Sequence, residues 1–272
     1  MTKRTRQEHV SDVKEAVELA RDLAGQLKAL EARGVSLIPV VPVPLEVSET
    51  KVEDVAPIEV VAEVETVTRA PRNLGKEARL KHLQDQAEKC RRCKLAGGRK
   101  RVVFGVGSAS ARVMFIGEGP GAEEDRTGIP FVGRAGKLLT CMLEAIGVKR
   151  DDVYIANIVK CRPPGNRDPH PDEVGACRAF LEAQLEAIGP EVVVAIGRPA
   201  AQSLLGTTAP LGKLRGSLHR FRDRDLLVTY HPAYLLRNPV KKQESWADLC
   251  HLADMLVARG ALSPTAGKWG EK

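Results

Sequence analysis

Residues 192–196 read Val-Val-Val-Ala-Ile, a short run that contains only apolar side chains. Comparable runs lie at Val113–Ile116, Val153–Ile158 and Leu226–Thr229. Short, nearly uninterrupted apolar runs of this kind are typical of strands that are buried on both faces of a sheet. The four runs therefore predict the strands of a buried sheet.

Stretches with helical spacing of their apolar residues alternate with these runs. The expected helices span residues 76–90, 137–146, 171–188, 200–205 and 245–259. Strands that alternate with helices predict an α/β protein, with a parallel sheet covered by helices on both faces. Ligands of such sheets bind beyond the carboxyl ends of the strands, so the loops that follow the strands are the place to look for chemistry.

The segment before residue 73 has a different composition. Apolar residues at helical spacing from Val10 to Leu30, with Gly34 as a stop, predict a helix within residues 1–33. Residues 34–68 contain repeated prolines and one lysine against seven acidic residues. This composition predicts a largely disordered extension with a linker at 34–72. A domain at 73–260 and a tail at 261–272 complete the expected organisation.

Composition limits the class of protein. The chain has 272 residues, of which 43% are hydrophobic, so it can form a sizeable core. Its apolar runs are far shorter than a membrane span of about 20 residues, and the N-terminus lacks the pattern of a signal peptide. A cytoplasmic protein is therefore expected. The net charge of +7 is concentrated after residue 68, which suits a polyanionic partner such as nucleic acid.

Four cysteines have the spacing of metal ligands. Cys90 and Cys93 form a C-x2-C pair, and Cys161 and Cys177 follow at distant points. Two thiols on one tight turn with two remote thiols predict a four-thiolate site, and both zinc and iron–sulfur clusters accept it. The alternative is that Cys161 and Cys177 are ordinary buried thiols. The other two cysteines, at 141 and 250, fall within helical apolar patterns and are expected in the core.

The loop after the first strand reads Gly117-Glu118-Gly119-Pro120-Gly121-Ala122-Glu123-Glu124-Asp125. Its glycines partly match a dinucleotide-binding fingerprint. However, Pro120 and three consecutive acidic residues would stand where the pyrophosphate approaches. The loop better suits a site in which glycines expose backbone N–H groups and carboxylates orient a water molecule or a base.

Two further loops carry candidate residues. Asn157 ends the second strand, where its amide can read the edge of a base or simply satisfy backbone groups. His231 follows the last strand and precedes a rigid loop with two leucines, Leu235 and Leu236, that we expect to be exposed. Exposed leucines next to Arg237 predict a wedge that enters a stack of bases.

These motifs together resemble a known family. GEGPGAEED (117–125) with GIPFVG (128–133), NIVKCRPPGNR (157–167), HPAYLLRNP (231–239) and the four spaced cysteines are similar to the family 4 uracil-DNA glycosylases of the iron–sulfur type. The resemblance covers about residues 85–258. It implies a three-layer α/β/α domain with a central four-stranded parallel sheet. It also implies a structural [4Fe–4S] cluster on the four cysteines, and hydrolysis of the deoxyuridine N-glycosidic bond in DNA.

The resemblance also assigns roles to residues. Phe131 would stack on the flipped uracil, Asn157 would pair with its edge, and His231 would donate a hydrogen bond to O2. Related families carry an aspartate where this chain has Gly119, so we choose Glu118 as the group that activates water. The implied set comprises the catalytic residues Glu118, His231 and Glu124, the substrate-binding residues Gly119, Phe131, Asn157 and Asn166, and the DNA-wedge residues Leu235 and Arg237.

A second class of function stays open, in which the chain is a non-catalytic, uracil-recognising DNA-binding module associated with a polymerase. The presence of Glu118, Asn157 and His231 together favours the enzyme. Uracil-containing DNA is the expected partner, the chain is expected to act as a monomer, and the N-terminal extension is expected to bind a protein partner.

Overall fold

The structure, a computed structural model, describes residues 67–68, 71 and 73–263. The expected helix at 1–33 lies outside these residues, as do nearly all of the expected linker at 34–72 and residues 264–272 of the expected tail. Those segments stay predictions. The described helices and strands run from Lys76 to Ala258.

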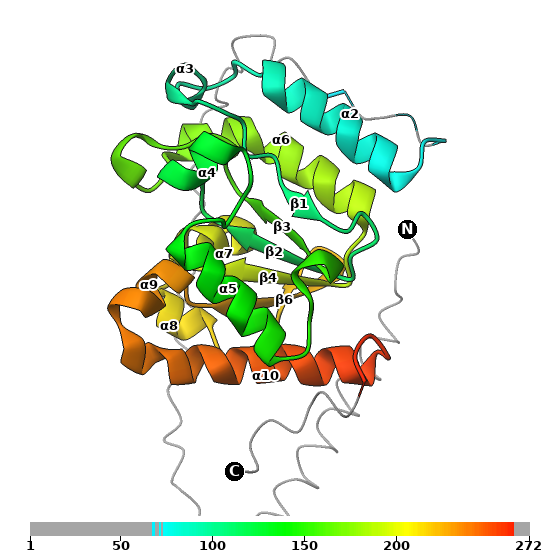
Figure 1. The fold of residues 1–272 in the computed structure, drawn as a ribbon, viewed down its shortest axis with the longest axis vertical. Coiled ribbons are helices and arrows are strands. Elements are labelled where there is room, and N and C mark those ends of the chain that lie inside the picture. The colour runs from blue at the N-terminus through cyan, green and yellow to red at the C-terminus, as the bar shows by residue number, and fades with distance from the viewer. Residues whose placement is uncertain (1–66, 69–70, 72, 264–272) are drawn as a thin grey trace, which may run out of the picture. The chain divides into compact units, whose positions relative to one another are not determined.

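A six-stranded sheet with the order β1-β3-β2-β4-β6-β5 forms the centre of the fold (Figure 1). The four inner strands pair in parallel. They are β3 (Tyr154–Asn157), β2 (Val113–Gly117), β4 (Val192–Ile196) and β6 (Arg224–Thr229). Each of the four apolar runs in the sequence therefore supplies one inner strand.

The expected number of strands was wrong, because one antiparallel strand is added at each edge. β1 (Val106–Gly107) pairs with β3, and β5 (His219–Phe221) pairs with β6. β1 has only two residues, and β5 reads His-Arg-Phe, so neither has the apolar pattern of a buried strand. Arg222, with a positive φ of 56°, makes the turn from β5 to β6. These two segments can be identified as strands only from their pairing with β3 and β6 in the structure.

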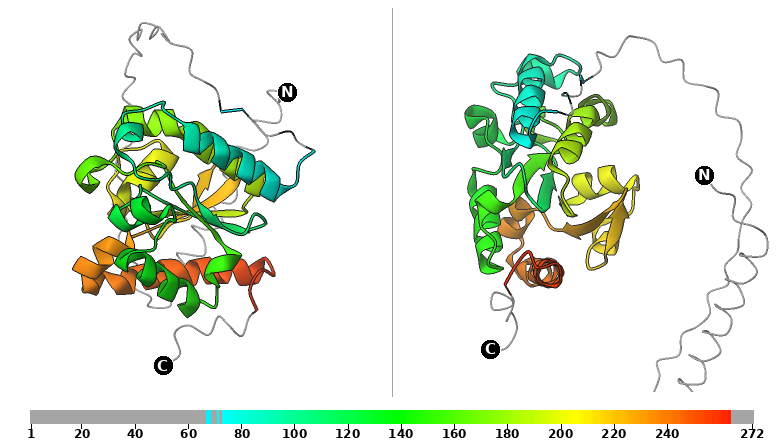
Figure 2. Two further views of the ribbon diagram at one scale, coloured as in Figure 1. Left: turned by 45° about the horizontal axis from the view of Figure 1, so that its top comes forward. Right: turned by 90° about the vertical axis from the view of Figure 1, so that its right-hand side faces the viewer.

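Helices cover both faces of the sheet, because successive residues of a strand point to opposite sides. In β2, Met114 and Ile116 enter one apolar cluster, whereas Val113 and Phe115 enter the other. The first face is covered by α2 (Lys76–Lys89), α6 (Pro171–Ile188) and α7 (Arg198–Leu205), and the second by α5 (Arg134–Ala145) and α10 (Lys242–Ala258) (Figures 1 and 2). The predicted α/β/α layering is confirmed.

Shorter elements connect these layers. They are α3 (Leu95–Gly98), α4 (Ala122–Thr127), α8 (Leu211–Leu214), α9 (Pro232–Arg237) and single 3₁₀ turns at Arg150–Asp152, Pro164–Asn166 and Pro239–Lys241. α4 and α9 follow β2 and β6 directly, so both lie at the carboxyl edge of the sheet (Figure 1). In the part of the chain that the structure describes, no helix has both the length and the apolar character needed to cross a bilayer.

α6 has well-defined ends that place two buried side chains. Pro171 occupies its first turn, and the carboxylate of Glu173 accepts the backbone N–H of His170 at 2.8 Å. Such caps satisfy backbone donors that a helix leaves unpaired. Cys177 and Gln184 lie two helical turns apart and are both buried. The same helix therefore carries a predicted metal ligand and a buried amide toward the sheet.

Helix α5 supports a loop through close backbone contact at Gly136. A Cβ atom there would lie 1.8 Å from the carbonyl oxygen of Phe131. We expect Gly136→Ala to lower the melting temperature, although alanine favours helices by about 1 kcal/mol over glycine. In α6, a Cβ at Gly175 would meet no atom within 4 Å, so Gly175→Ala should be stabilising. Thermal unfolding of both variants checks this, and shifts of the same sign would contradict it.

Candidate active site

A cavity of about 360 Å³ opens at the carboxyl edge of the parallel strands. Its lining comes from the loops that follow β2, β3 and β6 and from the segment between α4 and α5. The lining residues are Glu118, Gly119, Pro120, Gly121, Glu124, Phe131, Ala135, Asn157, Pro163, Asn166, Arg167, His231, Ala233, Tyr234 and Arg237. Every residue that the sequence suggested for catalysis or substrate binding is among them.

Gly117 brings Phe131 and Asn157 together. It ends β2 and pairs in register with Asn157 at the end of β3. A Cβ at Gly117 would lie 2.5 Å from Oδ1 of Asn157 and 2.6 Å from the ring of Phe131, so only glycine fits. Asn157 is 1% exposed, and its Oδ1 has no hydrogen-bond partner. Because a buried polar atom without a partner is costly, this oxygen indicates a place for a ligand donor.

The carboxylate of Glu124 holds the loop that carries Phe131. Its Oε1 accepts the backbone N–H groups of Val132 and Gly133, both at 3.0 Å, and its Oε2 accepts that of Gly121 at 3.1 Å. Phe131 has a positive φ of 53°, which is unfavourable for a bulky residue and must be held by its surroundings. With both oxygens engaged by backbone donors, Glu124 acts as a positioning residue. The structure shows this positioning contact, and the catalytic role expected for Glu124 stays a prediction.

Glu118 is a partly buried carboxyl group next to the cavity. Burial, reinforced by the nearby negative charge of Asp168 and opposed by Arg198, raises the pKa of Glu118 to about 7. A carboxyl group with a pKa near neutrality can both accept and release a proton at physiological pH. Glu118 therefore has the properties of a general base.

His231 is neutral at physiological pH. Burial and the positive charge of Arg237 lower its pKa to about 4, against the opposing effect of Glu124. Its Nδ1 accepts the backbone N–H of Ala233 at 3.1 Å, which leaves the proton on Nε2. The ring lies 5.5 Å from that of Phe131. His231 is therefore a neutral hydrogen-bond donor beside the aromatic ring.

The loop after β3 supplies Asn166, another predicted residue. Asn166 has a positive φ of 55°, and its Oδ1 accepts the Nε–H of Arg162 at 2.8 Å. Its neighbour Arg167 makes two hydrogen bonds, at 2.7 and 2.8 Å, with the buried carboxylate of Glu173. The hydrogen bonds from Arg167 lower the pKa of Glu173 to about 2. The loop is therefore anchored to the start of α6.

Gly119 is required by close packing. A Cβ at this position would lie 2.9 Å from the side chain of Val159. An aspartate here would force the loops after β2 and β3 apart. The absence of a carboxylate at position 119 thus follows from how this chain packs.

The structure corrects the expectation for Leu235. The segment 232–237 is the helix α9 rather than a loop, and its inner face is buried. Leu235 is 1% exposed, whereas its neighbour Leu236 is 37% exposed. Consecutive residues of a helix point in different directions, so only one of the two leucines can face solvent. Arg237, the other predicted wedge residue, lines the cavity.

The four predicted metal ligands gather around one small cavity. Cys90, Cys93, Cys161 and Cys177 all line it, and none is in a disulfide. Two donors point at sulfur atoms: Arg99 Nη1 lies 3.4 Å from Sγ of Cys161, and the backbone N–H of residue 160 lies 3.3 Å from Sγ of Cys177. In the described residues, no three potential ligands are spaced to hold a single metal ion. The thiols therefore surround a space rather than converge on one point.

The remaining cysteines differ from expectation. Cys141 is exposed, and Cys250 is only partly buried. In α5 the buried side chains are at Leu139 and Leu143, and residue 141 points away from that stripe. The sequence pattern placed Cys141 in the right helix but on the wrong face.

A buried lysine lies between the two cavities. Lys160 is 2% exposed, and its Nζ donates to the backbone oxygen of Asn157 at 2.9 Å and to Oε1 of Gln184 at 2.6 Å. Nε2 of Gln184 in turn donates to the backbone oxygen of Phe104. Burial lowers the pKa of Lys160 to about 8, whereas the nearby Cys177 and Cys161 raise it. Both hydrogen-bond acceptors of Nζ are neutral.

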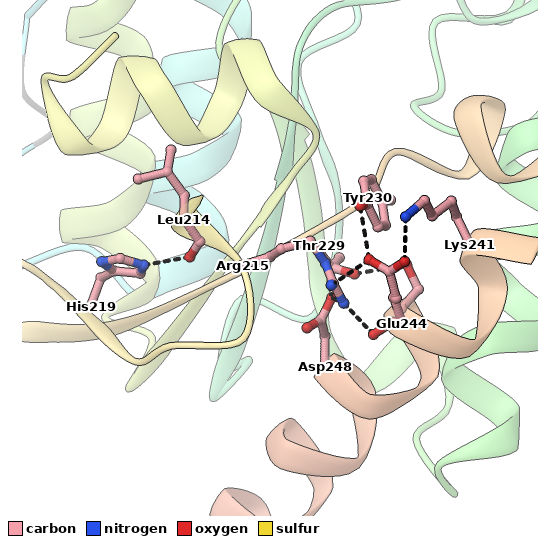
Figure 3. Close-up of polar contacts among 9 residues, drawn as sticks. Leu214, Arg215, His219, Thr229, Tyr230, Lys241, Glu244 and Asp248 are labelled. Atoms are coloured by element: carbon pink, nitrogen blue, oxygen red, sulfur yellow. Dashed lines mark hydrogen bonds and ion pairs between the residues drawn. The ribbon is translucent and has the colours of Figure 1, made fainter. Parts of the chain in front are cut away.

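A second polar network supports the strand end before His231. The guanidinium of Arg215 pairs with Glu244 and Asp248, both at 2.8 Å, and lies 4.7 Å from the ring centre of Tyr230 (Figure 3). The hydroxyl of Tyr230 donates to Glu244 at 3.0 Å. This network ties the residue before His231 to the start of α10.

Comparison with known proteins identifies the class that this fold and site define. The sequence model described as "Uracil DNA glycosylase superfamily" matches residues 104–250. The chain is 47% identical over 165 residues to the type-4 uracil-DNA glycosylase of Thermotoga maritima, a match that covers 60% of this chain and 86% of that protein. It is 42% identical over 174 residues to the type-4 enzyme of Archaeoglobus fulgidus, covering 61% and 87%.

The chain belongs to the type-4 uracil-DNA glycosylases of this superfamily. It is also 35% identical over 156 residues to a DNA polymerase of Bacillus phage SP01. That match covers 57% of this chain and 17% of the polymerase.

Sequence reasoning missed several residues around the cavity. Arg150 holds the loop before Phe131, since its Nη2 donates to the backbone oxygen of Pro130 at 2.8 Å. Tyr234 lines the cavity and stacks on Tyr230. Arg150 has no local signal in the sequence, because its partner lies 20 residues away. Tyr234 lies within the motif at 231–239, but the motif alone does not show that its ring faces the cavity.

The two displaced pKa values can be measured directly. In carbon-13 NMR spectra, we expect the carboxyl resonance of Glu118 to titrate near pH 7. The ring of His231 should stay neutral down to about pH 4, with its proton on Nε2. Glu118→Gln and His231→Gln assign the two signals. Ordinary midpoints near the reference values of about 4.3 and 6.5 would contradict the proposed burial of both groups.

Proposed function

We propose that the chain hydrolyses the N-glycosidic bond of deoxyuridine in DNA and leaves an abasic site, the first step of base excision repair. One observation carries the mechanism: the unpartnered Oδ1 of Asn157, beside the ring of Phe131 and the neutral His231. Membership of the type-4 family supports the same reaction.

Uracil has the hydrogen-bonding pattern that complements Asn157. Its N3–H would donate to the unpartnered Oδ1, and its O4 would accept from Nδ2. Cytosine carries an acceptor at N3 and a donor at N4, so the same amide would face two mismatched groups. A site built to hydrogen-bond one base rejects an analogue strongly, because mismatched buried groups stay unpaired. Phe131 would stack on the face of the base after it leaves the helix.

Bond cleavage would use His231 and Glu118. Negative charge grows on uracil O2 as the bond to the sugar breaks, and the Nε2–H of neutral His231 is the donor offered to it. Such a preorganised donor contributes roughly 3–4 kcal/mol in other enzymes. Glu118 would take a proton from the water that attacks the sugar carbon. Because Glu118 is protonated below a pKa of about 7, the rate is expected to fall as pH drops below that value.

We further propose that the four cysteines hold a [4Fe–4S] cluster. Four free thiols around one cavity, with N–H groups directed at two sulfur atoms, fit a cluster held by thiolates. When bound, the cluster would cross-link α6, the loop after β3 and the segment after α2. Its role would be structural, because the proposed hydrolysis transfers no electrons.

At the surface, we propose Leu236, rather than Leu235, as the residue that enters the vacated base stack, because it is the exposed leucine of α9. Arg237 would contact the adjacent backbone. The net charge of +7 supports DNA as the partner. We also propose that the chain acts as a cytoplasmic, nucleoid-associated monomer and that residues 1–72 bind a protein partner.

The alternative is a non-catalytic, uracil-recognising module associated with a polymerase. Similarity to part of the phage polymerase favours it. The displaced pKa values of Glu118 and His231 support the enzyme, because a binding module needs neither a proton acceptor nor a neutral histidine. Alkaline cleavage of a uracil-containing strand after incubation with the protein separates the two functions.

Base selection tests the role of Asn157. Asn157→Asp should lower uracil excision about tenfold to a hundredfold, because a carboxylate lacks the donor to O4 and one paired contact contributes roughly 1–3 kcal/mol. The ratio of uracil to cytosine excision should fall as well. His231→Ala is the matched comparison: it should slow single-turnover excision by ~10²–10³ and leave that ratio unchanged. An unchanged ratio in Asn157→Asp would refute the proposed pairing.

Metal analysis tests the cluster. Protein purified without air should be brown and contain four irons and four sulfides per chain. Cys177→Ser should lose iron, because it removes a buried ligand, whereas Cys141→Ser should keep it, because Cys141 is exposed on α5. A colourless, active protein with one zinc ion would show that the four thiols hold a different metal.

A further inference from the structure

A basic groove lies beside the cysteine cavity, outside the proposed active site. Residues 91–101 read Arg-Arg-Cys-Lys-Leu-Ala-Gly-Gly-Arg-Lys-Arg, with six basic residues and no acidic one. Arg91, Arg99, Lys100 and Arg101 line a groove whose opposite wall is formed by Thr127–Ile129, just after α4. Glu88 is its one acidic lining residue. The groove thus carries a clear excess of positive charge.

The exposed cations of this segment have no carboxylate partner. Most arginines elsewhere in the described chain form ion pairs, for example Arg112 with Glu191 and Arg178 with Glu182. In contrast, Lys100 and Arg101 have no acidic group within ion-pair distance among the residues that the structure describes, and both are exposed. Exposed, unpaired cations grouped on one wall can neutralise an external polyanion.

The segment is nevertheless held in place. The backbone N–H of Lys100 donates to the buried carboxylate of Asp125 at 2.9 Å, which ties the loop to α4. Arg99 donates to the backbone oxygens of Cys90 at 2.9 Å and Glu88 at 2.8 Å. The side chain of Arg101 packs over Gly128. The backbone that carries Lys100 and Arg101 is therefore tied to α4 and to the residues around Cys90.

Helix α4 joins the groove to the active-site cavity. Gly121 and Glu124, at its start, line the cavity, and Thr127–Ile129, at its end, line the groove. A helix of six residues is about 9 Å long. Phosphates of one DNA strand recur about every 3.4 Å along the duplex axis. With α4 along that axis, the groove would lie roughly two to three nucleotides from the cavity.

We propose that this groove binds the phosphate backbone of the DNA strand that carries the uracil, two to three nucleotides away from the flipped base. The inference rests on the proposed function, because it takes its position on the DNA from the base in the cavity. Lys100 and Arg101 are the contacting residues. They add affinity for DNA of any sequence and take no part in the chemical step.

The test measures binding of the full chain to duplex DNA that contains a tetrahydrofuran abasic analogue, so that no reaction occurs. Lys100→Gln with Arg101→Gln should weaken binding about tenfold at moderate salt. The slope of log affinity against log salt should become shallower by about 1.8, since each phosphate contact contributes about 0.9 on duplex DNA. The control pair is Arg79→Gln, in the first turn of α2, with Lys149→Gln, just before the 3₁₀ turn Arg150–Asp152. Neither residue lines the groove. The control should leave affinity and slope unchanged.

Substrate length provides the second measurement. The short substrate is a DNA trinucleotide whose middle base is uracil, so that it has one flanking nucleotide on each side. On this trinucleotide, the Lys100→Gln with Arg101→Gln variant and the wild type should excise uracil at equal rates. Three results would each overturn the proposal. They are a loss of excision on the trinucleotide as large as the loss of binding to the duplex, an unchanged salt slope on the duplex, and an equal loss of duplex binding in the control pair. Loss of binding to RNA but not to DNA would assign the groove to RNA instead. Failure of the wild type to excise uracil would count against the proposed function, whereas analogue binding tests the groove alone.

Discussion

The buried amino group of Lys160 is the contact on which the arrangement of both cavities depends. It donates to the backbone oxygen of Asn157 on one side and to the amide oxygen of Gln184 on the other, and all three residues are buried. A buried network of this kind is stable only when each member is satisfied, because an unpaired polar group in a dry interior is costly. Lys160 also precedes Cys161 in sequence, and its N–H points at Cys177. These contacts tie the end of β3 at Asn157 to the loop that carries Cys161 and to the helix α6 that carries Cys177.

Burial has opposite effects on the two titratable groups of the active site, and both effects serve the same chemistry. Removing water disfavours the charged form of any side chain, so it raises the pKa of Glu118 and lowers that of His231. The result is a carboxyl group poised near neutrality and a histidine that donates a hydrogen bond without carrying charge. One physical cause thus gives a carboxyl group that titrates near neutrality and an uncharged histidine within a single cavity.

Much of this could be predicted from particular residues. The apolar runs at 113–116 and 192–196 predicted buried parallel strands, because they are short and alternate with stretches of helical spacing. Edge strands β1 and β5 could not be found, since two or three residues carry no periodic signal. The carboxylates Glu118 and Glu124 look equivalent in sequence, and only the backbone donors around Glu124 reveal that it holds the Phe131 loop.

The sequence by itself determined the layered α/β fold, the family, the spacing of the thiols and which loops form the site, because these follow from local patterns of residue type. Only the tertiary structure decided which side chains are free to act. It buried Leu235 and exposed Leu236, and it left Oδ1 of Asn157 without a partner while giving Glu124 three. Burial and hydrogen-bond saturation depend on neighbours that are distant in the chain. A local sequence pattern therefore cannot specify them.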